Sequence, residues 1–292
     1  MEVQQSLSGG VPAASIVPHP DVPVLTPLCA SIVERTLVPL GATGSTDVMF
    51  YRPRGPGGPL PLVYFLASGE AGSDAADYGA LANELAEGAA VNVVLLRHDK
   101  GGGYPARNRL ALEILRHILA SPWDYGIDPE RVAIVGDGLG GNLAAALALP
   151  EGGAAIAGLR LQVLICPILA ELRMNGRGDT DEHPNTTAIL DQTNRIFPDR
   201  SARLSPAAFP GLAGAEQLAG SPAALILVAE KDATRAGTES FATSLRLAGV
   251  GVVCVTINGA RHDFIAHRSA DPGAYRAAKA LIIASIRDAM DR

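Results

Sequence analysis

An α/β protein built on one mostly parallel sheet is indicated by two features of this sequence. Short runs rich in Val, Ile and Leu alternate with segments of helical length, which is typical of a parallel sheet covered by helices on both faces. The chain has 292 residues, of which 48% are hydrophobic, so it can bury the core of one large domain. We therefore expect a single sheet of eight strands.

The eight predicted strands are short and well separated along the chain. They lie at residues 32–38, 46–52, 61–67, 91–97, 131–135, 161–166, 224–229 and 252–257. The first two are close in sequence, so we expect them to pair antiparallel. Helices are predicted between the later strands and after the last one, at about residues 75–87, 105–120, 139–149, 236–248 and 272–290.

Two tracts interrupt this alternation of strands and helices. Residues 1–27 are polar and rich in proline, and residues 167–220 mix prolines with short amphipathic pieces and no strand signal. Long irregular stretches in a compact domain often form lids over active sites. We therefore expect a catalytic core at 28–166 plus 221–292, and a cap or lid made of 1–27 plus 167–220.

Charge and composition narrow the range of partners. The net charge is -6, and no run of Lys or Arg occurs, which argues against nucleic acid or an anionic membrane. We find neither an apolar window long enough to span a bilayer nor a secretory leader pattern, so a cytoplasmic protein is expected. Cys29, Cys166 and Cys254 are widely spaced, which predicts buried reduced thiols rather than disulfides or metal ligands. A small molecule is the expected partner.

The densest motif joins the predicted strand 131–135 to the helix that follows it. Residues Gly136 to Gly141 read GDGLGG, between an apolar strand and an Ala/Leu-rich helix. This order matches the nucleophile elbow, G-x-S-x-G, whose tight turn lifts the side chain of its central residue above the sheet. Gly138 stands where that motif has serine, so the chain lacks the hydroxyl that would attack a carbonyl.

The same six residues also match the G-x-G-x-x-G turn of dinucleotide-binding proteins. That site needs an acidic residue about 20 positions further on, at the end of the next strand. The next predicted strand, LQVLIC, ends without one, and the turn lies after four strands. We therefore prefer the elbow interpretation. Dinucleotide binding and a plain packing turn remain the alternatives.

The residues around this turn resemble the hormone-sensitive-lipase-like carboxylesterases of the α/β-hydrolase fold. The stretches SPW, GIDPERVA and GDGLGGNLA follow one another from Ser121 and are similar to the helix, loop and elbow of that family. Towards the C-terminus, LILVAEKDA and ARHDF resemble its final strands. The resemblance covers most of the chain from about residue 60. It implies the α/β-hydrolase fold, with elbow, acid and base in that chain order.

The resemblance places Asp232 at the acid position and His262 at the base position. A carboxylate that accepts the Nδ1 proton of a histidine sets its tautomer and leaves Nε2 as a general base or acid near neutral pH. Such a pair can transfer protons without a serine. The alternative is that both residues are remnants on surface loops.

Further candidates surround this pair. The family's H-G-G-G motif falls on Leu66-Ala67-Ser68-Gly69 and is therefore degenerate. The backbone N–H groups of Ala67, Ser68 and Leu139 could still stabilise an oxyanion, because such donors are main-chain atoms. The candidate pocket residues are Leu66, Glu70, Asp137, Tyr104 and Phe264. Aromatic residues such as Tyr104 and Phe264 more often belong to the core than to a substrate site.

Because the serine is missing, we expect a non-hydrolytic enzyme that tailors a natural product. Cyclisation, C–C bond formation, elimination or isomerisation would use His262 and Asp232 as acid and base, with backbone stabilisation of an oxyanion. The expected substrate is a bulky apolar small molecule; no cofactor or metal is expected, and a homodimer is allowed. The alternatives are a ligand-binding pseudoenzyme or receptor, and a degenerate or engineered-inactive carboxylesterase.

Overall fold

Eight strands form one sheet in the structure of this protein, a computed structural model that describes residues 31–40, 44–55, 57–68, 75–97, 102–150, 156–172 and 185–292. The strand order is β1-β2-β4-β3-β5-β6-β7-β8. The strands are β1 (Ile32–Pro39), β2 (Ser45–Arg52), β3 (Leu60–Ala67), β4 (Asn92–Arg97), β5 (Ile127–Asp137), β6 (Leu159–Ile165), β7 (Ala223–Lys231) and β8 (Val252–Arg261). The prediction of a single eight-stranded sheet is confirmed.

The sheet is mostly parallel. β1 pairs antiparallel with β2, as predicted, and β2 pairs antiparallel with β4. All other neighbouring strands are parallel. The carboxyl ends of β3 to β8 therefore meet at one edge of the sheet, which is where ligands bind in open α/β sheets.

Two strands extend four residues beyond the prediction at one end, β5 at its start and β8 at its end. β5 begins at Ile127 and pairs with the start of β3 before a register shift at Pro61/Leu62, and this irregularity accommodates Pro129, which favours a loop in the sequence. β8 continues through Asn258-Gly259 to Arg261. An Asn-Gly pair is typical of a turn. Here the strand continues through it, because the irregular backbone of Gly259, with a φ of +78°, falls at a register shift in the β7–β8 pairing. The longer β8 carries the chain directly to His262.

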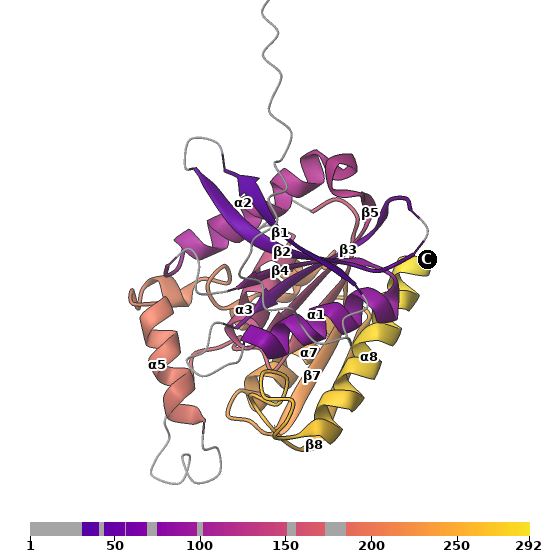
Figure 1. The fold of residues 1–292 in the computed structure, drawn as a ribbon. Coiled ribbons are helices and arrows are strands. Elements are labelled where there is room, and N and C mark those ends of the chain that lie inside the picture. Colours follow the sequence, from indigo (N-terminus) through magenta and orange to yellow (C-terminus); the bar gives the residue numbers. More distant parts are fainter. Residues whose placement is uncertain are drawn as a thin grey trace, which may run out of the picture.

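Helices cover both faces of the sheet. On one face lie α1 (Ala75–Ala89) and α8 (Pro272–Asp291), which contact each other and run side by side in Figure 1. On the other face lie α2 (Ala106–Ala120), α3 (Leu139–Ala148) and α7 (Arg235–Leu247). Each of the five predicted helices is present, with ends within two residues of the prediction.

The alternation of side chains along the strands divides the core into two layers. In β3, Leu62, Tyr64 and Leu66 join the cluster under α2, α3 and α7. Val63, Phe65 and Ala67 join the cluster under α1 and α8. Successive residues of a strand point to opposite faces, so a strand buried on both faces is apolar throughout.

The tract 167–220 contains α5 (Thr186–Ile196), α6 (Ala215–Leu218) and two short 3₁₀ turns, and no strand among its described residues. A third apolar cluster joins α5 and the residues after it to the start of α3, and consists of Leu139, Ile168, Ile189, Phe197, Ala208 and Phe209. We call this the lid cluster. Residues 1–27 and 173–184 lie outside the described residues, so the division into core and cap stays a prediction.

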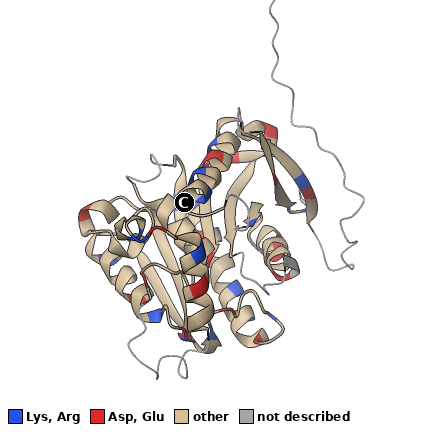
Figure 2. Ribbon diagram, turned by 90° about the vertical axis from the view of Figure 1, so that its left-hand side faces the viewer, with Lys and Arg blue, Asp and Glu red and all other residues tan. Residues whose placement is uncertain are grey.

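Charged residues lie mainly on the helices and loops, with both signs interspersed (Figure 2). In the described parts of the chain, no helix is both long and apolar enough to cross a membrane.

Candidate active site

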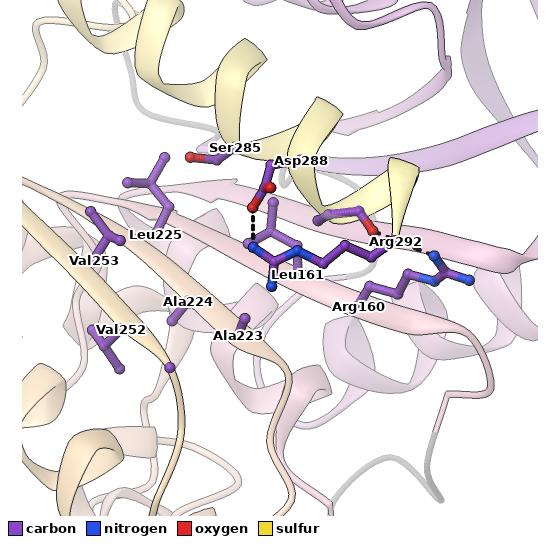
Figure 3. Close-up of a pocket in the computed structure, with 12 residues that line it drawn as sticks. Arg160, Leu161, Ala223, Ala224, Leu225, Val252, Val253, Ser285, Asp288 and Arg292 are labelled. Carbon is purple, nitrogen blue, oxygen red and sulfur yellow. Dashed lines mark hydrogen bonds and ion pairs between the residues drawn. The ribbon is translucent and has the colours of Figure 1, made fainter.

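The polar residues predicted to form the site come together at the carboxyl edge of the sheet. Gly138 follows β5, Asp232 follows β7 and His262 follows β8. A cavity of about 570 Å³ lies at the opposite edge, between the amino ends of β6, β7 and β8 and the last turns of α8 (Figure 3). Its lining includes Arg160, Leu225 and Asp288 but none of the predicted site residues. The predicted catalytic residues therefore lie away from this cavity.

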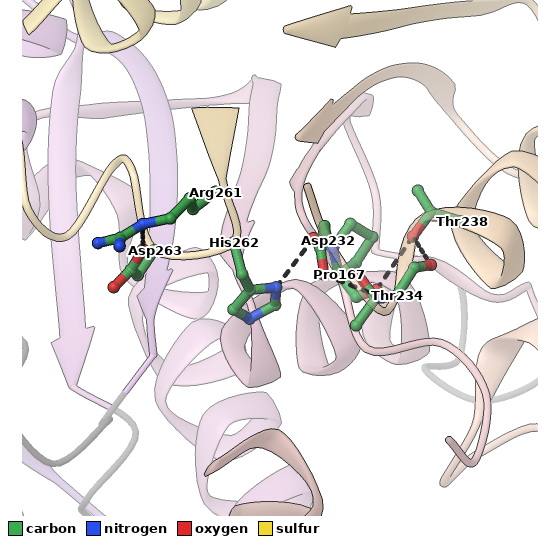
Figure 4. Close-up of polar contacts among 7 residues, drawn as sticks. All are labelled: Pro167, Asp232, Thr234, Thr238, Arg261, His262 and Asp263. Carbon is green, nitrogen blue, oxygen red and sulfur yellow. Dashed lines mark hydrogen bonds and ion pairs between the residues drawn. The ribbon is translucent and has the colours of Figure 1, made fainter. Parts of the chain in front are cut away.

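Asp232 and His262 form a buried hydrogen-bonded pair (Figure 4). Nδ1 of His262 lies 2.9 Å from Oδ2 of Asp232, and the two residues are 3% and 2% exposed. They therefore do not lie on the surface. An Nδ1 proton shared with the carboxylate leaves Nε2 as the ring nitrogen available for acid–base chemistry.

The charged form of Asp232 is held by donors from two directions. Its Oδ1 accepts the backbone N–H of Thr234 at 2.8 Å, just before α7, and its Oδ2 faces His262. Burial raises the pKa of this carboxyl, but the positive charge and hydrogen bond of His262 and the N–H of Thr234 outweigh burial, so its pKa lies below the ordinary value. The carboxylate is thus ionised at neutral pH and can orient His262.

The turn at Gly138 has the geometry of an elbow. Gly138 has a φ of 55° and a ψ of -116°, between the end of β5 and the start of α3. Its N–H donates to the carbonyl of Ile165, and its carbonyl accepts from the N–H groups of Asn142 and Ile168. Residues other than glycine rarely adopt this positive φ, so the turn combines a sharp strand-to-helix reversal with a conformation that costs glycine little.

A close backbone contact places the elbow beside the end of β3. A Cβ on Gly140 would lie 2.0 Å from the carbonyl oxygen of Leu66, so only glycine permits this approach. The contact brings the start of α3, with Leu139, next to the segment that carries Ala67 and Ser68. These are the three residues whose backbone N–H groups we predicted as oxyanion donors.

The remaining predicted residues have different surroundings. Asp137 is buried and accepts a hydrogen bond of 2.6 Å from the hydroxyl of Tyr78, in keeping with a residue that supports the turn. Leu66 and Phe264 are buried in the two main apolar clusters. Tyr104 packs against Phe197 of the lid cluster at a ring distance of 5.5 Å. Glu70 lies outside the described residues.

Cys166 belongs to this constellation, although the sequence suggested only a buried thiol. It follows β6 with a φ of +41°, and its Sγ lies within 4.8 Å of ligand atoms of Asp232 and His262. Burial and the negative charges of Asp232 and Asp137 raise its pKa well above the ordinary value, so the thiol stays protonated and is a poor nucleophile. The sequence did place Cys166 at the end of a predicted strand. The ends of parallel strands meet at one edge of the sheet, so this position could have predicted that Cys166 lies near the site.

Among the described residues, Cys166, Asp232 and His262 form the group that could hold a metal ion. Their ligand atoms lie within 4.8 Å of one another. The carboxylate, however, already accepts hydrogen bonds from Thr234 and His262, and the thiol beside it stays protonated. The expectation of a site without metal stays a prediction.

Comparison with known proteins now identifies the family. A family model described as the alpha/beta hydrolase fold matches residues 62–266. The chain belongs to this family. Its fold agrees with carboxyl esterase 2 of the fungus Tuber melanosporum, with a TM-score of 0.78 and 25% identity, covering 89% of this chain and 88% of that one.

Two sequence relatives of this alpha/beta hydrolase are named as ester hydrolases. Ethyl acetate hydrolase of Pseudomonas putida is 31% identical over 70% of this chain, and the carboxylic ester hydrolase LipN of Mycobacterium tuberculosis is 30% identical over 77%. The matches span 65% and 62% of the two relatives, somewhat less than two thirds of each.

These comparisons correct our functional expectation. A cyclase, lyase or isomerase that tailors a secondary metabolite was predicted from the missing serine, and that prediction was wrong, because the relatives are esterases and carboxylic ester hydrolases. The physical reason is that a glycine at the elbow argues against one reaction without indicating another. The alternative of a degenerate carboxylesterase fits the comparisons better.

Proposed function

We propose that this chain is a degenerate carboxylesterase that binds carboxylic esters but does not form an acyl-enzyme. The observation that carries the proposal is Gly138, which has the conformation of an elbow nucleophile and no side chain. In this interpretation Gly138 replaces the serine of the active relatives. An acyl-enzyme requires a covalent bond from a side-chain atom at this position, and glycine has none.

Ester binding does not require that side chain. The predicted oxyanion donors at Ala67, Ser68 and Leu139 are main-chain groups, so they are independent of side-chain substitutions. Such donors bind the oxygen of a polarised carbonyl. The lid cluster, which includes Leu139 itself, is apolar but buried, so its side chains would have to move to contact the acyl or alcohol part of the ester. This arrangement supports recognition of an apolar small molecule.

Asp232 and His262 would then serve as a positioned polar pair. The carboxylate keeps the imidazole in one tautomer, and Nε2 offers a hydrogen bond to an ester oxygen. Without a covalent intermediate, the pair has no nucleophile to activate and no acyl group to release. The bound ester is therefore expected to leave unchanged.

Ligand-observed NMR with ethyl butyrate tests this proposal. The purified chain should broaden or shift the ester signals, and the ester should be recovered intact after long incubation. Heat-unfolded protein is the control for non-specific association. Release of butyrate faster than in buffer would contradict the loss of hydrolysis, and unaltered ester signals would contradict the binding function.

A further inference from the structure

Arg107 lies in an unusual place for a charged residue. It is 2% exposed and belongs to the buried face of α2, with Ala111, Ile114, Leu115 and Ile118. Burial lowers its pKa to about 9, so the guanidinium still carries its charge at neutral pH. A buried charge is costly unless it is paired.

The contacts of Arg107 leave this charge uncompensated. Its Nη2 donates to Oδ1 of Asn142 at 2.8 Å, and its Nε donates to Oδ1 of Asn108 at 3.2 Å. Its Cζ lies 5.0 Å from the ring centroid of Phe197. Nη1 is buried with no hydrogen-bond partner, and no described carboxylate forms an ion pair with the group.

A second buried arginine in the same region shows what full compensation looks like. Arg203 is 6% exposed, and its Nη1 pairs with Glu171 at 2.8 Å. Its Nη2 donates to Asn194, and its Nε donates to the carbonyl of Phe197. Every guanidinium nitrogen of Arg203 therefore has a partner, one of them anionic. Arg107 lacks this anion.

Arg107 is also close to the elbow. Its partner Asn142 is one helical turn into α3, and the N–H of Asn142 donates to the carbonyl of Gly138 at 3.0 Å. A turn of four residues rises about 6 Å. The lid cluster runs between these points, since it contains both Leu139 and Phe197. These side chains are buried, so a chain of a few methylene groups would have to part them to reach from the elbow towards Arg107.

We propose that Arg107 binds a carboxylate, and that the ligand of this site is an ester whose acyl chain ends in a carboxylate group. The ester carbonyl would lie at the elbow, the methylene chain against the lid cluster, and the distal carboxylate on Nη1 of Arg107. Charge-assisted hydrogen bonds of this kind are among the strong ones in proteins. Nη1 is covered in the unliganded structure, so Phe197, which lies over the guanidinium, has to move when the carboxylate binds. This assignment rests on the proposed ester-binding function.

Calorimetric titration with monoethyl adipate and diethyl adipate, which share one acyl chain, tests the assignment. The wild-type chain should bind the anionic half-ester at least about tenfold more tightly than the neutral diester, which corresponds to about 1.4 kcal/mol. In Arg107→Gln this preference should disappear while diester affinity stays within about twofold. Arg109→Gln, an exposed neighbour on α2, is the matched control and should keep the preference.

The outcomes separate this assignment from the function on which it rests. Equal binding of the two esters by the wild-type chain would overturn the carboxylate site alone. Equal loss of both affinities in Arg107→Gln would also overturn it, because a purely structural role has no reason to favour the anion. If Arg107→Gln fails to fold, Arg107→Lys takes its place and should retain part of the preference for the half-ester. Complete loss of that preference in a folded Arg107→Lys variant would count against the site. Failure of both esters to bind would overturn ester binding and this assignment together.

Discussion

The two halves of the site differ in what they offer to a substrate. Around Gly138 the backbone makes the sharp reversal of an elbow, including the close contact of Gly140 with Leu66, but there is no side chain to react. Around Asp232 and His262 the side chains themselves form the site, buried and hydrogen-bonded. The comparison teaches that the scaffold of an active site depends on many backbone contacts, whereas covalent chemistry depends on a single atom.

The largest effect is expected from restoring that atom. Gly138→Ser should convert the chain into an esterase for short activated esters, with a rate at least about 10³-fold above the unaltered chain. Loss of the serine in subtilisin costs about 10⁶ in kcat, so partial recovery leaves ample signal. Release of p-nitrophenol from p-nitrophenyl butyrate measures it.

Two control variants test whether the activity of Gly138→Ser depends on its hydroxyl and on His262. Gly138→Ala introduces the same backbone strain without a nucleophile and should stay inactive. Gly138→Ser combined with His262→Ala should lose most of the gain, because no base remains to take the serine proton. A serine variant that is folded and silent would mean that the two halves of the site are not aligned.

The next largest effect concerns the backbone contact of the elbow. Gly140→Ala should lower the free energy of unfolding by about 3 kcal/mol or more, because its Cβ would lie 2.0 Å from the carbonyl oxygen of Leu66 and neither backbone can yield easily. Urea unfolding monitored by circular dichroism measures the change.

Gly237→Ala is the matched control for this change. Gly237 lies in α7, and an added Cβ would meet only the Cβ of Ala170 at 3.6 Å. We expect this variant to be more stable than the wild-type chain by up to about 1 kcal/mol. Similar destabilisation of both variants would argue against a special role for the elbow contact.

Removing the charge of Asp232 should have a moderate effect that depends on pH. The pKa of this carboxyl is lowered in the folded state, so its ionised form contributes stability above the unfolded pKa, near 4, and loses it as pH falls further. Asp232→Asn should therefore cost about 1.5–3 kcal/mol at pH 7 and much less near pH 3. Urea titrations from pH 3 to pH 7 measure this difference.

Asp263→Asn is a suitable comparison because its carboxylate makes only long contacts, 3.8 Å to the exposed Arg261 and 3.7 Å to the partly exposed His267. Exposed pairs contribute little, so the cost should stay below about 1 kcal/mol. If the two variants were equally destabilised at pH 7, the hydrogen bonds of Asp232 would have no special value.

The smallest effect is a difference in thiol reactivity. Cys166 should react with iodoacetamide at least about tenfold more slowly than the half-buried Cys254, because burial and nearby carboxylates raise its pKa well above the ordinary value and only thiolates react readily. Peptide mapping by mass spectrometry assigns the modified residue. The two thiols should react alike in denaturant, and rapid modification of native Cys166 would contradict its place beside Asp232.

Local patterns predicted the fold well because they act over short distances. Short apolar runs located every strand, and the predicted helix ends agree with the observed ends within two residues. The errors occurred at Pro129 and at Asn258-Gly259, where a local signal for a loop or turn was overridden by sheet pairing. Asp232 and His262 were identified through resemblance to a family, and the structure shows that they meet.

The sequence by itself determined the order of strands and helices along the chain and the glycine at the elbow, since these follow from residue type and local spacing, and its resemblance to a family pointed to Asp232 and His262. Only the tertiary structure decided that Cys166 contacts Asp232 and that Arg107 is buried without an anion. Both facts depend on which strand ends and helix faces are neighbours in space, and on burial, which turns an ordinary thiol or guanidinium into a group that needs a partner.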